Sequence, residues 1–267
     1  MTAQSKPSKT LIAMVHVPAL PGTPAHEPGV KSLVGRCVRE AALLAGAGFD
    51  ALLIENMHDT PYLNGSVGPE ITATMAAVVA AIRAEVDCPL GVQILAAANR
   101  EALAVAHACG AQFIRAEGFV YAHVGDEGIH QSNAAELLRY RRMIGAESVK
   151  IFTDIKKKHS SHAITNDVSI VETAEAAQFF RADGLIITGS ATGKAASLEE
   201  LRAVHDATDL PVLVGSGVTA DNLAEYWDHA ESFIIGSTLK IDGRWDKAVD
   251  PARASAVIDA ATKLRGR

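Results

Sequence analysis

Residues 45–55, AGAGFDALLIE, decide the fold. The small residues up to Ala47 suit the end of a helix, and Gly48 suits the position just after it. Ala51–Glu55 is a short apolar run that does not alternate with polar residues, which predicts a strand buried on both faces, as in a parallel sheet. The same order of helix, short turn and strand returns at Cys109-Gly110-Ala111 and at Ala182-Asp183-Gly184.

Eight apolar runs of this kind follow one another along the chain: Leu11–Val17, Ala51–Glu55, Leu90–Leu95, Gln112–Ala116, Val149–Ile155, Gly184–Thr188, Pro211–Val214 and Ser232–Ile235. Apolar residues at helical spacing fill the gaps: Val30–Leu44, Ile71–Val86, Arg100–Cys109, Asn133–Ile144, Ser169–Arg181, Ser197–Ala207, Ala220–His229 and Pro251–Leu264. Pro69 and Pro251 suit the first turn of a helix, whereas Ser197 and Thr219 suit N-caps.

Strict alternation of strand and helix predicts a parallel sheet with right-handed crossovers. Eight such units close most naturally as a single-domain (β/α)8 TIM barrel, here expected over residues 11–267 after a flexible segment of residues 1–10. The alternative is an open doubly wound sheet. That fold would need a glycine-rich loop after the first strand, where the chain instead has His16-Val17-Pro18.

The composition and charge of the chain limit the kinds of partner that it is expected to bind. The net charge of -6 argues against nucleic acid as a partner, and no apolar run approaches the roughly 18 residues of a membrane span. The N-terminus lacks the apolar region of a signal peptide, and Cys37, Cys88 and Cys109 form neither a disulfide framework nor a zinc motif. We therefore expect a cytoplasmic protein that binds a small molecule, and a homo-oligomer because barrels of this kind often pair.

The active site of such a barrel lies at the C-terminal ends of its strands. Acids and bases follow most of the predicted strands, although a buried barrel has no structural need for them there. We expect the catalytic groups to come from these positions: His16, Glu55, Glu117, Asp154, Lys156, Lys158 and His159.

Residues 154–159 contain the highest density of acidic and basic side chains at a predicted strand end. Alternation along a strand sends Asp154, Lys156 and Lys158 to one face, provided that the strand persists that far. A lysine beside another cation can lose its proton near neutral pH and act as a base or form a Schiff base. The alternative is a solvated basic loop in which Asp154 caps a turn.

Glycines and hydroxyl residues follow the last two predicted strands, at Gly215-Ser216-Gly217 and Gly236-Ser237. Glycine lets backbone N–H groups approach an anion closely, and a helix starting near Thr219 would add its positive dipole end. Loops in these positions often bind phosphate in barrels, although the glycines could also serve only to make tight turns. We expect these residues to bind a phosphorylated small molecule: Asn56, Gln93, Arg115, Thr188, Gly189, Ser190, Gly215, Ser216, Gly217, Gly236 and Ser237.

Neither a His-x-His nor a His-Glu-x-x-His pattern occurs, so the sequence predicts no metal site. It also signals no organic cofactor. A divalent ion such as magnesium, held by carboxylates, stays open as an alternative.

Several strand-end motifs occur together, in order and over nearly the whole chain: Met14-Val15-His16 with Leu20-Pro21-Gly22, Glu55-Asn56-Met57-His58-Asp59-Thr60-Pro61-Tyr62, Gly68-Pro69-Glu70, Phe113-Ile114-Arg115, Asp126-Glu127-Gly128, Phe152-Thr153-Asp154 with Lys158-His159, Thr188-Gly189-Ser190-Ala191-Thr192-Gly193, and Val214-Gly215-Ser216-Gly217-Val218. With these motifs the chain resembles the BtpA family, which includes SgcQ-like proteins. The resemblance implies a TIM barrel with kinship to phosphate-binding barrels. It also implies links to photosystem I biogenesis in one cyanobacterial relative and to carbohydrate metabolism in others.

Two residues depart from the pattern of the family. Glu117 stands where many relatives have Asn, and Lys156 stands where many have His. We expect the substrate to differ accordingly.

Two functions follow from these observations. The first is an enzyme of isomerase, lyase or glycosidic-bond-cleaving type that acts on a sugar phosphate or a nucleotide-like compound. The second, which the photosystem link suggests, is a non-catalytic assembly or stabilisation factor.

Overall fold

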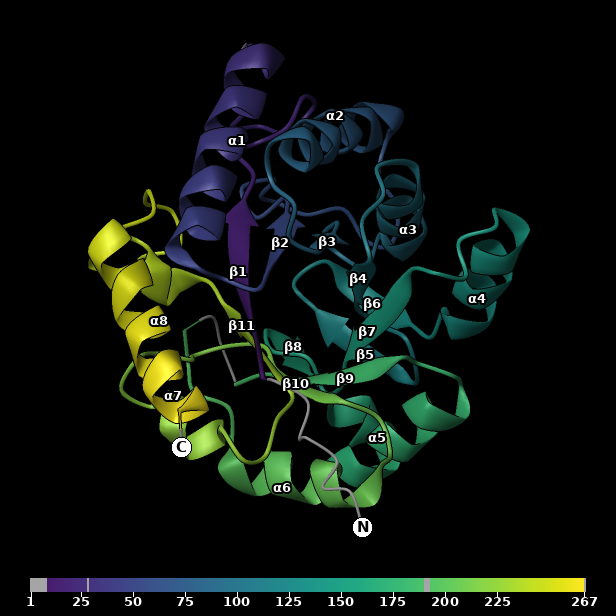
Figure 1. The fold of residues 1–267 in the computed structure, drawn as a ribbon. Coiled ribbons are helices and arrows are strands. Elements are labelled where there is room, and N and C mark those ends of the chain that lie inside the picture. The colour runs from purple at the N-terminus through teal and green to yellow at the C-terminus, as the bar shows by residue number, and fades with distance from the viewer. Residues whose placement is uncertain (1–8, 28, 190–192, 267) are drawn as a thin grey trace.

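The computed structural model describes residues 9–27, 29–189 and 193–266, and in them eight parallel strands close into a barrel (Figure 1). The predicted TIM-barrel fold is therefore confirmed. Around the barrel the strands neighbour one another in this order: β1 (Thr10–His16), β11 (Ser232–Ile235), β10 (Val212–Val214), β9 (Gly184–Ile187), β7 (Lys150–Asp154), β4 (Phe113–Ala116), β3 (Leu90–Gln93) and β2 (Ala51–Glu55).

Helices cover the outside of this barrel: α1 (Val30–Ala47), α2 (Pro69–Glu85), α3 (Asn99–Ala108), α4 (Ala134–Met143), α5 (Ile170–Phe179), α6 (Leu198–Ala207), α7 (Leu223–Tyr226) and α8 (Pro251–Arg265). Local sequence explains several of their ends. Pro69 and Pro251 begin α2 and α8, and the hydroxyl of Ser197 caps α6 by accepting from the N–H of Glu200. Gly48 ends α1 in the left-handed conformation, at φ 103°.

The helix expected over 220–229 is wrong in length and start. Only the four residues of α7 are helical, and the N-cap is Asn222 rather than Thr219. Thr219 and Asn222 bond each other instead: the Asn222 side chain accepts from the Thr219 N–H at 2.7 Å, and the Thr219 hydroxyl accepts from the Asn222 N–H at 3.2 Å. This local turn competes with the first helical turn, so the predicted helix dipole is not available to the loop before it.

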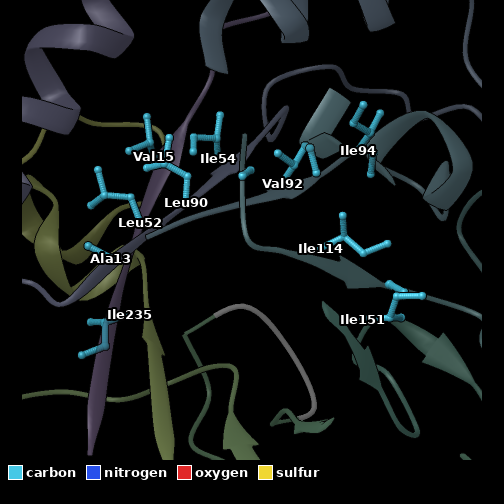
Figure 2. Close-up of a cluster of buried hydrophobic side chains, with 14 of the residues drawn as sticks. Ala13, Val15, Leu52, Ile54, Leu90, Val92, Ile94, Ile114, Ile151 and Ile235 are labelled. Carbon is cyan, nitrogen blue, oxygen red and sulfur yellow. The ribbon is translucent and has the colours of Figure 1, made fainter. Parts of the chain in front are cut away.

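Alternation along each strand divides the core into two parts. Outward-facing side chains pack between the strands and the helices. Those labelled in Figure 2 are Ala13, Val15, Leu52, Ile54, Leu90, Val92, Ile94, Ile114, Ile151 and Ile235. Inward-facing side chains form a second apolar cluster inside the barrel: Ile12, Met14, Ala51, Leu53, Phe113, Ile186, Leu213 and Ile234, with Phe152 against it.

Two aromatic rings help to fill the inside of the barrel. The rings of Phe113 and Phe152 lie 5.5 Å apart on the neighbouring strands β4 and β7. Gly91 makes room for the first ring, because a Cβ there would lie 2.1 Å from Phe113, and Gly184 makes room for Phe152 in the same way. Above this apolar layer lies one further inward position on the strands. Polar residues occupy it on five of them: His16, Glu55, Gln93, Arg115 and Asp154.

A small antiparallel sheet stands apart from the barrel strands, and the sequence did not predict it. It consists of β5 (Ala122–Gly125), β6 (Gly128–Gln131) and β8 (Ser160–Ser161), inserted after β4 and β7. Because both insertions leave from C-terminal strand ends, they bring residues 118–131 and 155–162 together beside the mouth of the barrel.

The barrel begins at Thr10, one residue before the predicted domain boundary, and most of the predicted flexible segment lies outside the described residues. Among the helices that the structure describes, none has the length and apolar character required to span a membrane.

Candidate active site

A cavity of about 330 Å³ opens at the C-terminal ends of the strands. The inward positions above the apolar layer supply much of its wall: His16, Glu55, Gln93, Arg115, Asp154, Gly215 and Gly236. Arg115 is the second-to-last residue of β4, and each of the others stands at or directly after the end of its strand. The pairing of β1, β2 and β3 places His16, Glu55 and Gln93 side by side. The structure thus brings together most of the residues predicted from the sequence.

Arg115 and Asp154 form a buried ion pair in this wall. Nε of Arg115 donates to Oδ2 of Asp154 at 2.9 Å, and Nη2 donates to Oδ1 at 2.8 Å. Burial alone would lower the pKa of Arg115, but the carboxylate of Asp154 outweighs it and raises this pKa. Both oxygens of Asp154 are therefore engaged by a permanent cation, and the guanidinium is held at the cavity by its partner.

His16 and Glu55 lie next to each other on β1 and β2, with Nε2 and Oε2 3.9 Å apart. Burial and the nearby Lys240 lower the pKa of His16 to about 3, so its ring is neutral near pH 7. Nδ1 lies 3.1 Å from the carbonyl oxygen of Trp245, which only accepts, so Nδ1 carries the hydrogen. Nε2 is then left as an acceptor on the side of Glu55.

Glu55 and Lys158 both face the cavity, and burial moves their pKa values toward neutrality from opposite sides. Burial raises the pKa of Glu55, although Arg115 and Lys158 partly oppose it. Burial, together with the neighbouring Arg115, lowers the pKa of Lys158. Such a pair contains one group able to give a proton and one able to take it, which is the requirement for general acid–base catalysis.

Lys156 does not join this pair, contrary to the predicted alternation. The strand ends at Asp154, and Lys156 takes a left-handed backbone conformation with φ 47°, which turns the chain. Its ammonium donates instead to backbone carbonyl oxygens, that of Thr165 at 3.1 Å and that of Val168. Lys156 lies away from the cavity wall.

Lys157, which was not among the predicted site residues, faces the cavity in its place. Its ammonium lies 3.0 Å from Oε2 of Glu117 and is buried. Burial would lower the pKa of Lys157, but Glu117 outweighs this effect and raises it. The turn at Lys156 breaks the alternation of the strand, so that the consecutive residues Lys157 and Lys158 both line the cavity.

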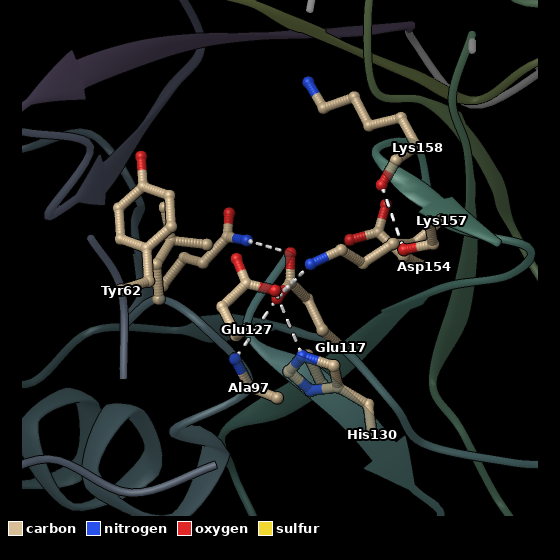
Figure 3. Close-up of polar contacts among 12 residues, drawn as sticks. Tyr62, Ala97, Glu117, Glu127, His130, Asp154, Lys157 and Lys158 are labelled. Atoms are coloured by element: carbon tan, nitrogen blue, oxygen red, sulfur yellow. Dashed lines mark hydrogen bonds and ion pairs between the residues drawn. The ribbon is translucent and has the colours of Figure 1, made fainter. Parts of the chain in front are cut away.

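Glu117 is the centre of a hydrogen-bond network on this wall (Figure 3). Oε2 accepts from Lys157 and from the N–H of Ala97 at 3.1 Å, and Oε1 accepts from Nε2 of Gln93 at 3.3 Å. Nearby, Glu127 pairs with His130 at 3.2 Å. Glu117 is thus engaged on both oxygens by protein donors.

The loops after β10 and β11 line the opposite part of the cavity, through Gly215-Ser216-Gly217 and Gly236-Ser237. The Ser216 hydroxyl ties two loops together, since it accepts from the Gly189 N–H at 2.6 Å and donates to the Lys194 carbonyl at 3.1 Å. Asn222 fixes the same loop by donating to the carbonyl of Gly217 at 2.8 Å. These loops are braced by side chains rather than by a long helix.

Three residues that were predicted to bind the ligand are not among those that line the cavity, and they hold its loops in place instead. The amide of Asn56 accepts from the Leu95 N–H and donates to Asp59, and so joins two loops. Thr188 accepts from the N–H of Lys158 at 3.1 Å, and Gly189 bonds Ser216. Ser190 lies outside the described residues.

His159 lines the cavity with much of its surface exposed, and the partial burial of its ring, together with the neighbouring Lys158, lowers its pKa. Other lining residues were not predicted as site residues, namely Met57, Tyr62, Asp126, Glu127 and Trp245. In residues 9–27, 29–189 and 193–266 no three His, Cys, Asp or Glu side chains are grouped so that they could hold a metal ion.

Comparison with known proteins finds relatives over almost the full length of the chain. The model of the BtpA family matches residues 7–263. An uncharacterised mitochondrial protein of Caenorhabditis elegans is 47% identical over 260 residues, which cover 96% of this chain and 94% of the worm protein. The photosystem I biogenesis protein BtpA of Synechocystis is 34% identical over 251 residues, which cover 94% of this chain and 87% of that protein.

A solved structure of similar shape is (S)-3-O-geranylgeranylglyceryl phosphate synthase from Thermoplasma acidophilum, in complex with its substrate sn-glycerol-1-phosphate. It has a TM-score of 0.59 and 16% identity, and the match covers 96% of this chain and 94% of the synthase. At this identity the likeness shows the fold alone.

Proposed function

The chain belongs to the BtpA family, and from the site in its barrel we propose that it is an enzyme acting on a small phosphorylated metabolite. The pair formed by Glu55 and Lys158 carries this proposal. Burying a carboxyl and an amine in one cavity, with their pKa values moved toward neutrality, destabilises the fold and has no structural use. The cost is explained if the pair moves protons during catalysis.

The anion end of the substrate is proposed to lie at the loops after β10 and β11. Gly215, Gly217 and Gly236 line the cavity there, and the Ser237 hydroxyl lies beside them. A Cβ at Gly217 would lie 2.3 Å from the carbonyl oxygen of Lys194 in the loop after β9, so the close packing of that loop against the loop after β10 requires glycine. The phosphorylated substrate of the solved synthase supports a phosphate ligand for a barrel of this shape.

Of the three reaction types expected from the sequence, isomerisation and aldol-type cleavage fit the groups best. Both reactions move a proton to or from a substrate atom next to a carbonyl. The pKa of Lys158 is shifted in the direction that favours a base and the pKa of Glu55 in the direction that favours an acid. Glycosidic-bond cleavage needs a second free carboxylate. Asp154 and Glu117 are instead engaged by Arg115 and Lys157.

Arg115 is proposed to bind the carbonyl or hydroxyl oxygen on which negative charge develops. It is buried at the cavity and is held rigidly by Asp154, so it does not reorganise during the reaction. Asp154 then acts as a positioning residue rather than as a proton carrier.

Ligand binding and turnover test this proposal. Melting temperatures are measured with inorganic phosphate, phosphorylated aldoses and phosphorylated ketoses, and binders are then assayed for interconversion or cleavage by NMR. We expect stabilisation by at least one of them, and turnover that falls by about 10²–10⁴-fold in Lys158→Met. Lys156→Met is the matched control and should leave turnover unchanged, because its ammonium bonds backbone carbonyls away from the cavity. No binding by any compound would contradict the proposal.

The second candidate is a non-catalytic assembly or stabilisation factor; the cyanobacterial relative is named a photosystem I biogenesis protein. One observation favours it here: Phe179 is 82% exposed at the end of α5, and its ring lies 5.8 Å from the half-exposed Phe180. Recovery of a stable partner that is lost in Phe179→Ser, with no response to phosphorylated compounds, would favour this candidate.

Three further predictions from the sequence stay proposals: homo-oligomerisation, the absence of a nucleic-acid partner and a cytoplasmic location. The worm relative is described as mitochondrial, so the compartment needs its own measurement, such as fractionation of cells that express the tagged protein.

A further inference from the structure

Gln93 carries a buried acceptor with no donor. This residue ends β3, is 2% exposed and lines the cavity. Its Nε2 donates to Glu117, but Oε1 has no hydrogen-bond partner among residues 9–27, 29–189 and 193–266. A buried polar atom without a partner destabilises the fold, and its presence next to a cavity points to a missing ligand group.

The orientation of this amide is fixed by its neighbour. Glu117 accepts from Lys157 and from the N–H of Ala97 on one oxygen and from Gln93 on the other. Turning the Gln93 amide by 180° would place its oxygen against the Glu117 carboxylate, where two acceptors repel each other. Oε1 of Gln93 therefore keeps its position and is available only to a hydrogen-bond donor.

The position of Gln93 relative to the phosphate loops sets the size of the ligand. Going round the barrel in either direction, β3 is the fourth strand from β10, so the two strands stand on opposite walls. A molecule that has its phosphate at Gly215 and Gly217 and reaches Gln93 crosses the mouth of the barrel. It passes Glu55 on one side and Arg115 on the other, where the proposed chemistry takes place.

The ammonium of Lys157, a donor in this wall, is engaged by Glu117, and other groups that line the cavity are acceptors. Asp126 and Glu127, from the turn of the small sheet, line the same cavity. Tyr62 lies on this side too, and its hydroxyl donates to the carbonyl of Met57 at 2.7 Å. An apolar tail would leave Oε1 of Gln93 unpaired, whereas a hydroxyl or amino group would satisfy it.

We propose that the substrate bears a hydroxyl or amino group at the end remote from its phosphate, and that Oε1 of Gln93 accepts a hydrogen bond from it. This inference rests on the proposed function. It selects phosphorylated polyols, sugars and amino compounds that span the cavity, and it excludes phosphates with an apolar tail.

Calorimetry with Gln93→Met tests the inference, because Met keeps the length of the side chain and removes the acceptor. The probes are inorganic phosphate, ribose 5-phosphate, glucose 6-phosphate and glycerol phosphate, followed by analogues of the tightest binder that each lack one hydroxyl. We expect Gln93→Met to weaken the tightest binder about tenfold and to leave phosphate unchanged. One of the analogues should bind the wild type about tenfold more weakly, and parent and analogue should bind Gln93→Met equally.

The outcomes separate this inference from the proposed function. If neither phosphate nor any phosphorylated compound binds, the proposed function fails. If phosphate binds but no polyol phosphate binds more tightly than phosphate itself, the inference alone is overturned. Equal affinity of the wild type for every analogue overturns it as well, and this measurement needs no variant, so it decides even if Gln93→Met does not fold.

Discussion

Arg115 and Asp154 face each other from the neighbouring strands β4 and β7 and share two hydrogen bonds, of 2.9 and 2.8 Å, inside the barrel. This pairing explains how a carboxylate can stand at the end of a buried apolar run, since each charge is compensated by the other. Under the proposed function the guanidinium rather than the carboxylate acts on the substrate, because both oxygens of Asp154 already accept from Arg115.

Asp154→Asn should therefore lower stability as well as activity. The amide keeps the shape but removes the negative charge, which leaves Arg115 buried without its counter-ion. We expect a loss of about 3 kcal/mol in the free energy of unfolding, measured by urea denaturation, and turnover reduced by at least about 100-fold.

The double variant Arg115→Met/Asp154→Asn is the control for this prediction. Removing both charges should recover most of the lost stability, because no unpaired charge remains, while activity stays low. A double variant as unstable as Asp154→Asn alone would show that the ion pair is not the cause.

Lys157→Met and Lys156→Met form a matched pair of variants on adjacent residues. Lys157 is buried against Glu117, so its removal should cost about 3 kcal/mol and disturb the wall of the cavity. Lys156 is half-buried and bonds only neutral carbonyl groups, so its removal should cost about 1 kcal/mol. Urea denaturation of both variants gives the comparison, and equal losses would contradict the assignment of Lys157 to the site.

The barrel itself was predictable because its signals are local and repeated. Each buried strand reads as a short apolar run, and glycine or proline marks several helix ends, as at Gly48 and Pro69. The helix expected after Thr219 failed because the Thr219–Asn222 turn offers the backbone another set of hydrogen bonds. The small sheet was missed because its strands, AHVG, GIHQ and SS, contain no apolar run of the kind that marks the barrel strands.

The site was predictable as far as strand alternation holds. Inward positions such as Glu55, Gln93 and Asp154 follow from the period of two, and all three line the cavity. Beyond a strand end this period no longer applies. The left-handed backbone of Lys156 turns the chain, so that Lys157 lines the cavity where Lys156 was expected to do so. A local sequence pattern does not predict which side chains pair across strands. The pairing of Asp154 with Arg115 and of Glu117 with Lys157 could therefore be seen only in the structure.

Glu55→Gln should stabilise the protein in a pH-dependent manner. Burial raises the pKa of Glu55 above its ordinary value of 4.5. At a pH below about 4, both the folded and the unfolded chain hold this proton, so the carboxyl costs nothing. As the pH rises from there, the unfolded chain ionises while the folded chain still holds the proton, so the folded state loses stability until the pH passes the raised folded pKa.

Gln is neutral at every pH and avoids this cost. The melting temperature of Glu55→Gln should exceed that of the wild type at pH 8, and the difference should vanish near pH 4, while turnover falls by about 10²–10⁴-fold. Scanning calorimetry across this range measures both limits. A Glu55→Gln variant that is less stable than the wild type at pH 8 would show that the ionised carboxylate is instead well compensated in the fold.

Gly217→Ala and Gly193→Ala separate backbone strain from close packing at the proposed phosphate loops. Both residues line the cavity and have left-handed backbones, with φ 68° and φ 76°. Alanine in this conformation costs about 1–2 kcal/mol. We expect this to be the main effect at Gly193, where a Cβ meets no atom of residues 9–27, 29–189 and 193–266 within 4 Å. At Gly217 the Cβ would lie 2.3 Å from the Lys194 carbonyl oxygen, so the loops must move apart. We expect Gly217→Ala to lose clearly more stability than Gly193→Ala in urea denaturation, and to weaken the binding of inorganic phosphate in calorimetry at least about tenfold more, because the anion site depends on the closeness of these loops rather than on a long helix.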